Sequence, residues 1–191
     1  MREFEPIFDF RKKEIIGYEV LYRGVENREA FFDLCTEEED LNIFLESLEF
    51  IKERRQNGKL YFVNVFATTV LKYPHVVSKA CLELKDCLVL EINERRKANF
   101  RKLKQVLEPF LICLDDFGSG WNSMEAMLKL KPHFVKVDVK HTGELFPLML
   151  KAVNLIAEKV ETQEEFLRVR KHKVFLVQGR FLNNIFNSQA C

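Results

Sequence analysis

Long apolar stretches are missing from this sequence. No run of apolar residues approaches the ~20 that a membrane-spanning helix requires. The N-terminal segment, MREFEPIFDF, carries Arg2, Glu3 and Glu5 and has no apolar core, so it does not have the pattern of a secretory signal. We therefore expect a cytoplasmic protein that does not work at a membrane.

A charge excess and paired cysteines are missing as well. The 30 Lys and Arg residues nearly balance the 29 Asp and Glu residues, which gives no electrostatic case for a nucleic acid polymer or an acidic membrane as partner. The cysteines are odd in number and scattered, with no CxxC motif. We expect reduced thiols and neither a disulfide nor a thiolate metal site. The cysteines are Cys35, Cys81, Cys87, Cys113 and Cys191.

The chain also lacks linkers, repeats and low-complexity segments. Its 191 residues are enough for one domain with a proper core, so we predict a single domain over residues 1–191. No GxGxxG or GxxxxGK[ST] motif follows the first expected strand and helix. This absence lowers the weight of the doubly wound folds that bind nucleotides through such glycine-rich loops.

What the chain does contain is an alternation of short apolar runs with helical spacings. The expected strands are residues 4–10, 14–24, 60–66, 87–93, 109–116, 133–139, 154–161 and 174–179. The expected helices are residues 40–58, 68–82, 96–108, 122–130, 143–152 and 162–172. Strands that alternate with helices predict a mostly parallel α/β sheet, either open and doubly wound or closed as a compact (β/α)₈ barrel.

Polar side chains occur at or near the ends of seven of these apolar strands. They are Glu19, Asn64, Glu91, Asp115 with Asp116, Lys136, Glu158 and Gln178. The carboxyl ends of parallel barrel strands gather at one mouth, so we expect these groups to converge there. In residues 133–139, Lys136 and Asp138 share one face of the strand. Charges on the interior side of a sheet are costly unless they are paired or bind a metal.

The side-chain types at these strand ends point to a particular kind of site. Glu19, Asn64, Glu91 and Asp115 offer hard oxygen donors, which suit Mg²⁺ or Mn²⁺ better than zinc. Asp115 and Asp116 are adjacent like charges at a strand end. One aspartate could bridge two cations ~3.5–4 Å apart, and the other aspartate could bind the second cation. The positive charge of the cations would then offset the repulsion between the two carboxylates.

Each of these residues has an ordinary structural explanation when it is taken alone. A single Asp before a turn is usually a cap, and a single Asn in a strand is usually a satisfied amide. Lys136 could form a structural ion pair with an Asp. Repetition across seven strands is not explained by these alternatives, and it favours a common site.

At these motifs the sequence resembles the EAL domain family, the bacterial signalling fold of cyclic di-GMP phosphodiesterases and receptors. The resemblance covers nearly the whole chain. It rests on Glu19-Val20-Leu21, which corresponds to the signature tripeptide, and on the segments FVNVF, LVLEINE, LDDFGSGWNSM, VKVD, IAEKVET and VQG. It implies a modified TIM-type (β/α)₈ barrel whose first strand is antiparallel, here with shortened helices and loops.

The resemblance also implies roles for individual residues. The metal ligands would be Glu19, Asn64, Glu91, Asp115 and Asp116. Catalytic roles would fall to Lys136, Glu19 and Glu158. Substrate contacts would come from Arg23, Asp138, Gln178 and Glu5, and the loop 117–123 would be stabilised by Glu94 and Ser119. The implied reaction is hydrolysis of cyclic di-GMP to linear pGpG by water activated at two Mg²⁺ or Mn²⁺ ions.

Some positions depart from the family pattern. Glu5 stands where the family commonly has Gln, Val139 stands where Arg is common, and residues 180–184 lack the usual aromatic-Ser-Arg-Pro segment. Three hypotheses therefore stay open: an active phosphodiesterase, a weak or inactive module that binds cyclic di-GMP, and a degenerate barrel that binds a protein. A homodimer or a regulatory protein partner is compatible with all three.

Overall fold

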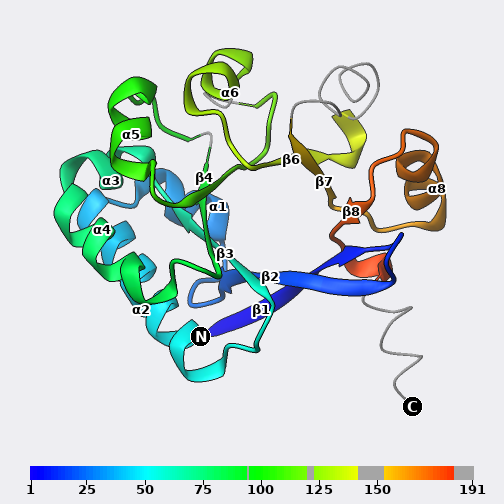
Figure 1. The fold of residues 1–191 in the computed structure, drawn as a ribbon, viewed down its shortest axis with the longest axis horizontal. Helices are drawn as coiled ribbons and strands as arrows, with labels where there is room; N and C mark the ends of the chain where they lie inside the picture. Colours follow the sequence, from blue (N-terminus) through cyan, green and yellow to red (C-terminus); the bar gives the residue numbers. More distant parts are fainter. Residues whose placement is uncertain (94, 120–122, 142–152, 183–191) are drawn as a thin grey trace.

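The strands of this protein close into a barrel. The structure is a computed structural model that describes residues 1–93, 95–119, 123–141 and 153–182. The strands in these residues are β1 (Arg2–Asp9), β2 (Glu14–Tyr22), β3 (Leu60–Val65), β4 (Leu88–Ile92), β5 (Leu111–Leu114), β6 (Phe134–Asp138), β7 (Asn154–Glu158) and β8 (Leu176–Val177). They are hydrogen-bonded in chain order, and β8 pairs with β1 (Figure 1). The expected barrel is confirmed, and the open sheet is excluded.

Strand β1 runs against its neighbours. It is antiparallel to β2, with Glu5 opposite Glu19, and antiparallel to β8, with Phe8 opposite Val177. The neighbouring pairs from β2–β3 through β7–β8 are all parallel. The carboxyl ends of β2 to β8 therefore meet at one end of the barrel, which we call the mouth.

Helices surround the barrel wall. They are α1 (Arg28–Leu34), α2 (Glu37–Arg54), α3 (Ala67–Lys72), α4 (Pro74–Cys81), α5 (Phe100–Leu107), α6 (Met124–Leu130) and α8 (Gln163–Lys171), with 3₁₀ turns η1 (Leu82–Leu84) and η2 (Val139–His141). Figure 1 shows α2, α3, α4 and α5 along one side of the barrel and α8 on the other side, near β8. Helix α2 begins with a capping box, in which Thr36 Oγ1 accepts from the Glu39 backbone N–H and the Glu39 carboxylate accepts from the Thr36 N–H.

The structure departs from the predicted helices at two places. The predicted helix 68–82 is two helices, because Pro74 cannot continue the hydrogen bonding of α3 and instead begins α4. Helix α1 was not predicted. The predicted helix 143–152 lies outside the described residues.

Two layers of side chains fill the barrel. The apolar interior layer consists of Ile7, Phe62, Val89, Cys113, Phe134 and Ile156. Its two rings, Phe62 and Phe134, meet edge to face with centroids 5.2 Å apart. Successive side chains of a strand alternate between its faces, so the residue two positions nearer the mouth also points into the barrel. Those positions form the second layer, which is polar.

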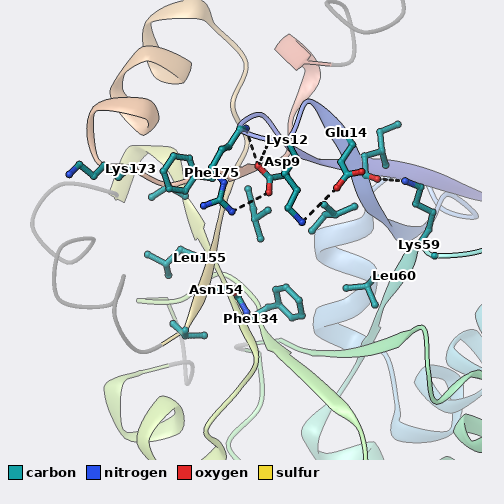
Figure 2. A pocket seen from close by; sticks show the side chains of 17 residues that line it. Asp9, Lys12, Glu14, Lys59, Leu60, Phe134, Asn154, Leu155, Lys173 and Phe175 are labelled. Atoms are coloured by element: carbon teal, nitrogen blue, oxygen red, sulfur yellow. Dashed lines mark hydrogen bonds and ion pairs between the residues drawn. The ribbon is translucent and has the colours of Figure 1, made fainter.

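The end of the barrel opposite the mouth has a cavity of its own. It has a volume of about 560 Å³ and is lined by residues at the amino ends of the parallel strands, among them Leu60 and Phe134 (Figure 2). Two ion pairs lie in its lining: Arg11 pairs with Asp9 at 3.7 Å, and Lys12 pairs with Glu14 at 3.7 Å. Lys59 and Lys173 also line the cavity, and the Lys59 ammonium donates to the Ile15 carbonyl, so the lining carries more basic than acidic side chains.

Two expectations from composition can be compared with the described residues. Among them, no helix combines the length and the apolar character that crossing a bilayer requires. The four described cysteines, Cys35, Cys81, Cys87 and Cys113, are free thiols, as predicted. Cys191 lies outside the described residues.

Candidate active site

The polar layer of the barrel lies directly above the apolar interior layer, on the side of the mouth. In β3 to β7 and just beyond them, the polar residue follows an apolar-layer residue by two positions: Phe62 and Asn64, Val89 and Glu91, Cys113 and Asp115, Phe134 and Lys136, Ile156 and Glu158. Glu19 from β2 and Gln178 after β8 complete the ring. We call this set of seven side chains the polar ring. The structure thus brings together the strand-end residues that the sequence singled out.

Lys136 connects several members of the polar ring. Its side chain is 1% exposed, and its Nζ lies 2.7 Å from Glu19 Oε2, 2.6 Å from Glu91 Oε1 and 3.9 Å from Asp115 Oδ1. Burial alone would lower the pKa of Lys136, but the charges of Glu19, Glu91 and Asp115 hold it well above its ordinary value. Lys136 is therefore a protonated ammonium at neutral pH.

Glu19 has the most complete set of partners in the ring. Its Oε2 accepts from Lys136 Nζ and, at 2.6 Å, from Gln178 Nε2, while its Oε1 accepts from Asn64 Nδ2 at 3.0 Å. Burial would raise the pKa of Glu19, but Lys136 and these hydrogen bonds together hold it below its ordinary value. Glu19 is thus an oriented carboxylate rather than an acid.

Glu91 and Glu158 are less well compensated. Within the described residues, Glu91 Oε2 and Glu158 Oε1 are buried and accept no hydrogen bond. Burial raises the pKa of both carboxyls well above the ordinary value, and the neighbouring Asp115 charge adds to the effect in each. Buried acceptor oxygens without donors are costly unless a cation or water satisfies them.

A second group of carboxylates lies beside Lys136. Asp115, Asp116 and Glu158 each place an oxygen within 4.8 Å of the others. Asp116 can join this group because its backbone leaves the pleat at the end of β5 and turns to a positive φ of 43°. The donors of the polar ring and of this group are carboxylate and amide oxygens, the ligand chemistry of Mg²⁺ and Mn²⁺. The residues present therefore fit divalent cations.

Lys159 stands next to this second group. Its Nζ is 2.6 Å from Asp116 Oδ1, 3.4 Å from Asp138 Oδ2 and 3.7 Å from Glu158 Oε1. Partial burial would lower the pKa of Lys159, but Glu158 and Asp116 raise it above the ordinary value. Lys159 was not among the predicted site residues, although it directly follows the strand-end residue Glu158.

Two adjoining cavities open at the mouth. One, of about 410 Å³, is lined by Glu19, Tyr22, Phe32, Asn64, Arg95 and Asp115, among others. The other, of about 530 Å³, is lined by Glu5, Arg23, Glu158, Gln178 and Arg180, among others. Both include Glu19, Asp115, Asp116 and Lys159, so the two cavities share the acidic centre. Their volumes are typical of small-molecule sites.

Of the predicted substrate contacts, Gln178 belongs to the polar ring, and the other three lie nearer the rim. Arg23 is ion-paired with Glu3 and borders the 530 Å³ cavity, as does Glu5. Burial raises the pKa of Glu5, and the charge of Glu19 adds to it. Asp138 contacts Lys159 and also accepts from the Lys140 backbone N–H at 2.8 Å.

Of the two residues predicted to stabilise the loop 117–123, the structure describes only Ser119. Ser119 is exposed, and its backbone N–H donates to the Asp116 carbonyl at 3.0 Å. Glu94 lies outside the described residues. Arg95 and Arg180, which also border the cavities, were not predicted. Only their position in the sequence could have indicated a place near the mouth, because Arg95 follows Glu91 by four residues and Arg180 follows Gln178 by two.

Known proteins share both the sequence pattern and the fold of this chain. The model of the EAL domain family matches residues 2–146. The chain is 25% identical over 182 residues to the probable cyclic di-GMP phosphodiesterase PdeI of Escherichia coli strain K12, in an alignment that covers 80% of this chain and 23% of PdeI. The chain thus spans about a quarter of the length of that relative.

Solved structures resemble the barrel closely. The cyclic di-GMP-bound form of a standalone EAL protein from Vibrio cholerae O395 has a TM-score of 0.76 at 22% identity, covering 94% of this chain and 89% of that protein. The manganese and cyclic di-GMP complex of BlrP1 from Klebsiella pneumoniae at pH 6 has a TM-score of 0.77 at 20% identity, covering 93% of this chain and 53% of that protein. At these identities the likeness establishes a shared fold.

Proposed function

The chain belongs to the EAL domain family, and from this we propose that it hydrolyses one phosphodiester bond of cyclic di-GMP to give linear pGpG, with Mg²⁺ or Mn²⁺ as cofactor. In this reaction water adds to phosphorus, the bond from phosphorus to the ribose 3′ oxygen breaks, and that oxygen leaves with a proton. The observation that carries the proposal is the polar ring, in which side chains from seven strand ends converge above an apolar layer.

Two sets of oxygens support the metal requirement. Glu19, Asn64, Glu91 and Asp115 would hold one cation. Asp115 and Asp116 would hold the other, next to Glu158. Bound divalent cations would lower the pKa of water and neutralise charge on the phosphoryl group. The buried oxygens of Glu91 and Glu158 that lack donors in the described residues support this assignment.

Lys136 and Glu158 would position the attacking water through hydrogen bonds. The raised pKa of Lys136 keeps its ammonium protonated, so it can donate a hydrogen bond to the water but cannot take a proton from it. Glu158 Oε1 has accepting capacity left among the described residues. We assign Lys136 to orienting the water and Glu158 to accepting a hydrogen bond from it.

The rim of the mouth suits a flat ligand with two phosphates. Arg23, Arg95 and Arg180 border the cavities, and guanidinium groups bind phosphate through two parallel hydrogen bonds. Tyr22 and Phe32 line the 410 Å³ cavity and offer aromatic surface against which a guanine base can stack. These groups are those expected for a cyclic dinucleotide.

The test is a hydrolysis assay with purified protein, cyclic di-GMP and either Mg²⁺ or Mn²⁺, with pGpG followed by chromatography. We expect turnover that stops when EDTA is added. We expect Glu19→Gln to lower kcat by ~100-fold or more while the protein stays folded, because this change removes a ligand charge from the centre. The matched control is Glu108→Gln, an exposed position between α5 and β5, which should leave kcat unchanged.

The same experiment separates the other functions. If the protein binds cyclic di-GMP but forms no product, it is a binding module of the same family and not an enzyme. If the protein does not bind the dinucleotide at all, the hypothesis that remains is a degenerate barrel that binds a protein. If Glu19→Gln turns over cyclic di-GMP as fast as the wild type, the proposed activity stands but the assignment of Glu19 as a metal ligand is wrong.

A further inference from the structure

The ammonium of Lys159 contacts two carboxylates of the second group, Asp116 and Glu158. Resting on the proposed function, we infer that Lys159 is a built-in counter-ion that competes with the second divalent cation for Asp116 and Glu158. It would thereby set the cation concentration at which the mouth becomes fully loaded. Lys159 would thus adjust the metal occupancy of the site. This role differs from that of Lys136, which lies deep in the polar ring.

The backbone presents Lys159 to the acids at a conformational cost. Its φ is 58°, a left-handed value that non-glycine residues rarely adopt. The chain on both sides is fixed by hydrogen bonds, since the Gln178 N–H donates to the Ala157 carbonyl at 2.9 Å and the Val160 N–H donates to the Gln178 carbonyl at 3.1 Å. The strained residue is therefore held in place by the β7–β8 pairing, with its ammonium directed at the carboxylates.

The contacts of Lys159 overlap with the second group of carboxylates. Two of its three carboxylate contacts, Asp116 at 2.6 Å and Glu158 at 3.7 Å, are members of that group. An ammonium hydrogen-bonded to Asp116 Oδ1 blocks a coordination position and repels any cation that approaches it. Binding of the second ion through this oxygen would therefore displace Lys159.

Lys159 is also able to move. Its side chain is 49% exposed, in contrast to the 1% of Lys136, and its four-carbon stem is flexible. Asp138 Oδ2, 3.4 Å from Nζ, is not part of the second group and offers the displaced ammonium an alternative partner. The structure thus contains both the competing contact and a place to which the ammonium can retreat.

The test is direct measurement of Mn²⁺ binding in the absence of nucleotide, with free Mn²⁺ followed by electron paramagnetic resonance at constant ionic strength. Lys159→Gln keeps the backbone strain and a polar side chain but removes the charge. We expect its second Mn²⁺ to bind about tenfold more tightly than that of the wild type, which is the effect of removing one unit charge about 6 Å from a divalent ion in a water-like medium. The first Mn²⁺ should bind with an unchanged dissociation constant.

Two control variants define the result. Lys159→Arg keeps the positive charge and should bind the second ion no more tightly than the wild type. Lys171→Gln removes an exposed positive charge on α8 and should leave both dissociation constants unchanged.

Three outcomes would overturn the inference. If wild type and Lys159→Gln bind two ions with the same constants, Lys159 does not compete, and the proposed function is unaffected. If Lys159→Gln binds the second ion more weakly, Lys159 supports the site instead of opposing it. If neither protein binds Mn²⁺, the inference and the metal dependence of the proposed function fail together.

Discussion

Replacing Lys136 by methionine would test how the polar ring is balanced in the absence of metal. The change keeps an unbranched side chain of similar volume but removes the ammonium that lies 2.7 Å from Glu19 and 2.6 Å from Glu91. Both carboxylates are almost completely buried. Without Lys136 they must remain charged while buried next to each other and to Asp115, or take up protons.

The expected size of the effect follows from this burial. Removal of one partner from a buried ion pair costs about 3–5 kcal/mol in the free energy of unfolding. For a chain of this length, that loss lowers Tm by roughly 6–20 °C. Protonation of Glu19 and Glu91 limits the cost, so the loss should be smaller at pH 5 than at pH 8.

The assay is urea unfolding followed by circular dichroism, with EDTA present, at both pH values. Lys102→Met, on the exposed face of α5, is the matched control and should change the unfolding free energy by less than ~0.5 kcal/mol. Adding Glu91→Gln to Lys136→Met should recover part of the loss, because one unpaired charge is then removed. A loss below ~1 kcal/mol at pH 8, or an equal loss at both pH values, would refute the electrostatic reasoning.

Two further predictions concern the scaffold of the barrel. Asp40 accepts a hydrogen bond from the Phe66 N–H at 3.0 Å, and burial raises its pKa from 3.8 to about 6. Since the folded protein then binds this proton more tightly than the unfolded chain, stability should fall by up to ~3 kcal/mol as the pH rises from 4 to 7. Asp40→Asn should remove that decline in urea unfolding, and an unchanged pH profile would contradict the assignment. Gly17→Ala should lower Tm in differential scanning calorimetry, with a cost of about 1–3 kcal/mol, because the added Cβ would lie 2.4 Å from the Leu60 carbonyl oxygen. An alanine variant as stable as the wild type would show that β2 and β3 can separate without cost.

The parallel strands and the polar ring could be predicted because they follow from strand periodicity. Each apolar run predicted a strand, and seven of the eight strands had a polar residue at or near the end, in phase with the interior face, as Phe134 and Lys136 illustrate. Closure of the barrel and the antiparallel β1 came from the family resemblance and are confirmed. The roles given to individual site residues remain predictions.

Other features could not be read from the sequence. Helix α1 has seven residues, too few for an apolar spacing to stand out, and its N-cap contact from Ala30 N–H to Asn27 is local. Lys159 looks like an ordinary charged residue after a strand. Its importance arises from a left-handed backbone angle and from carboxylates contributed by β6 and the end of β5, which only the folded chain brings to it.

The apolar interior layer has a consequence for proton exchange. Phe62, Phe134 and their neighbours close the barrel beneath the polar ring, so water reaches Lys136 and Glu91 from the mouth. A ligand seated across the mouth would cut off that route. Lys136 and Glu91 would then exchange protons with the solution more slowly while the ligand is bound than in the free protein.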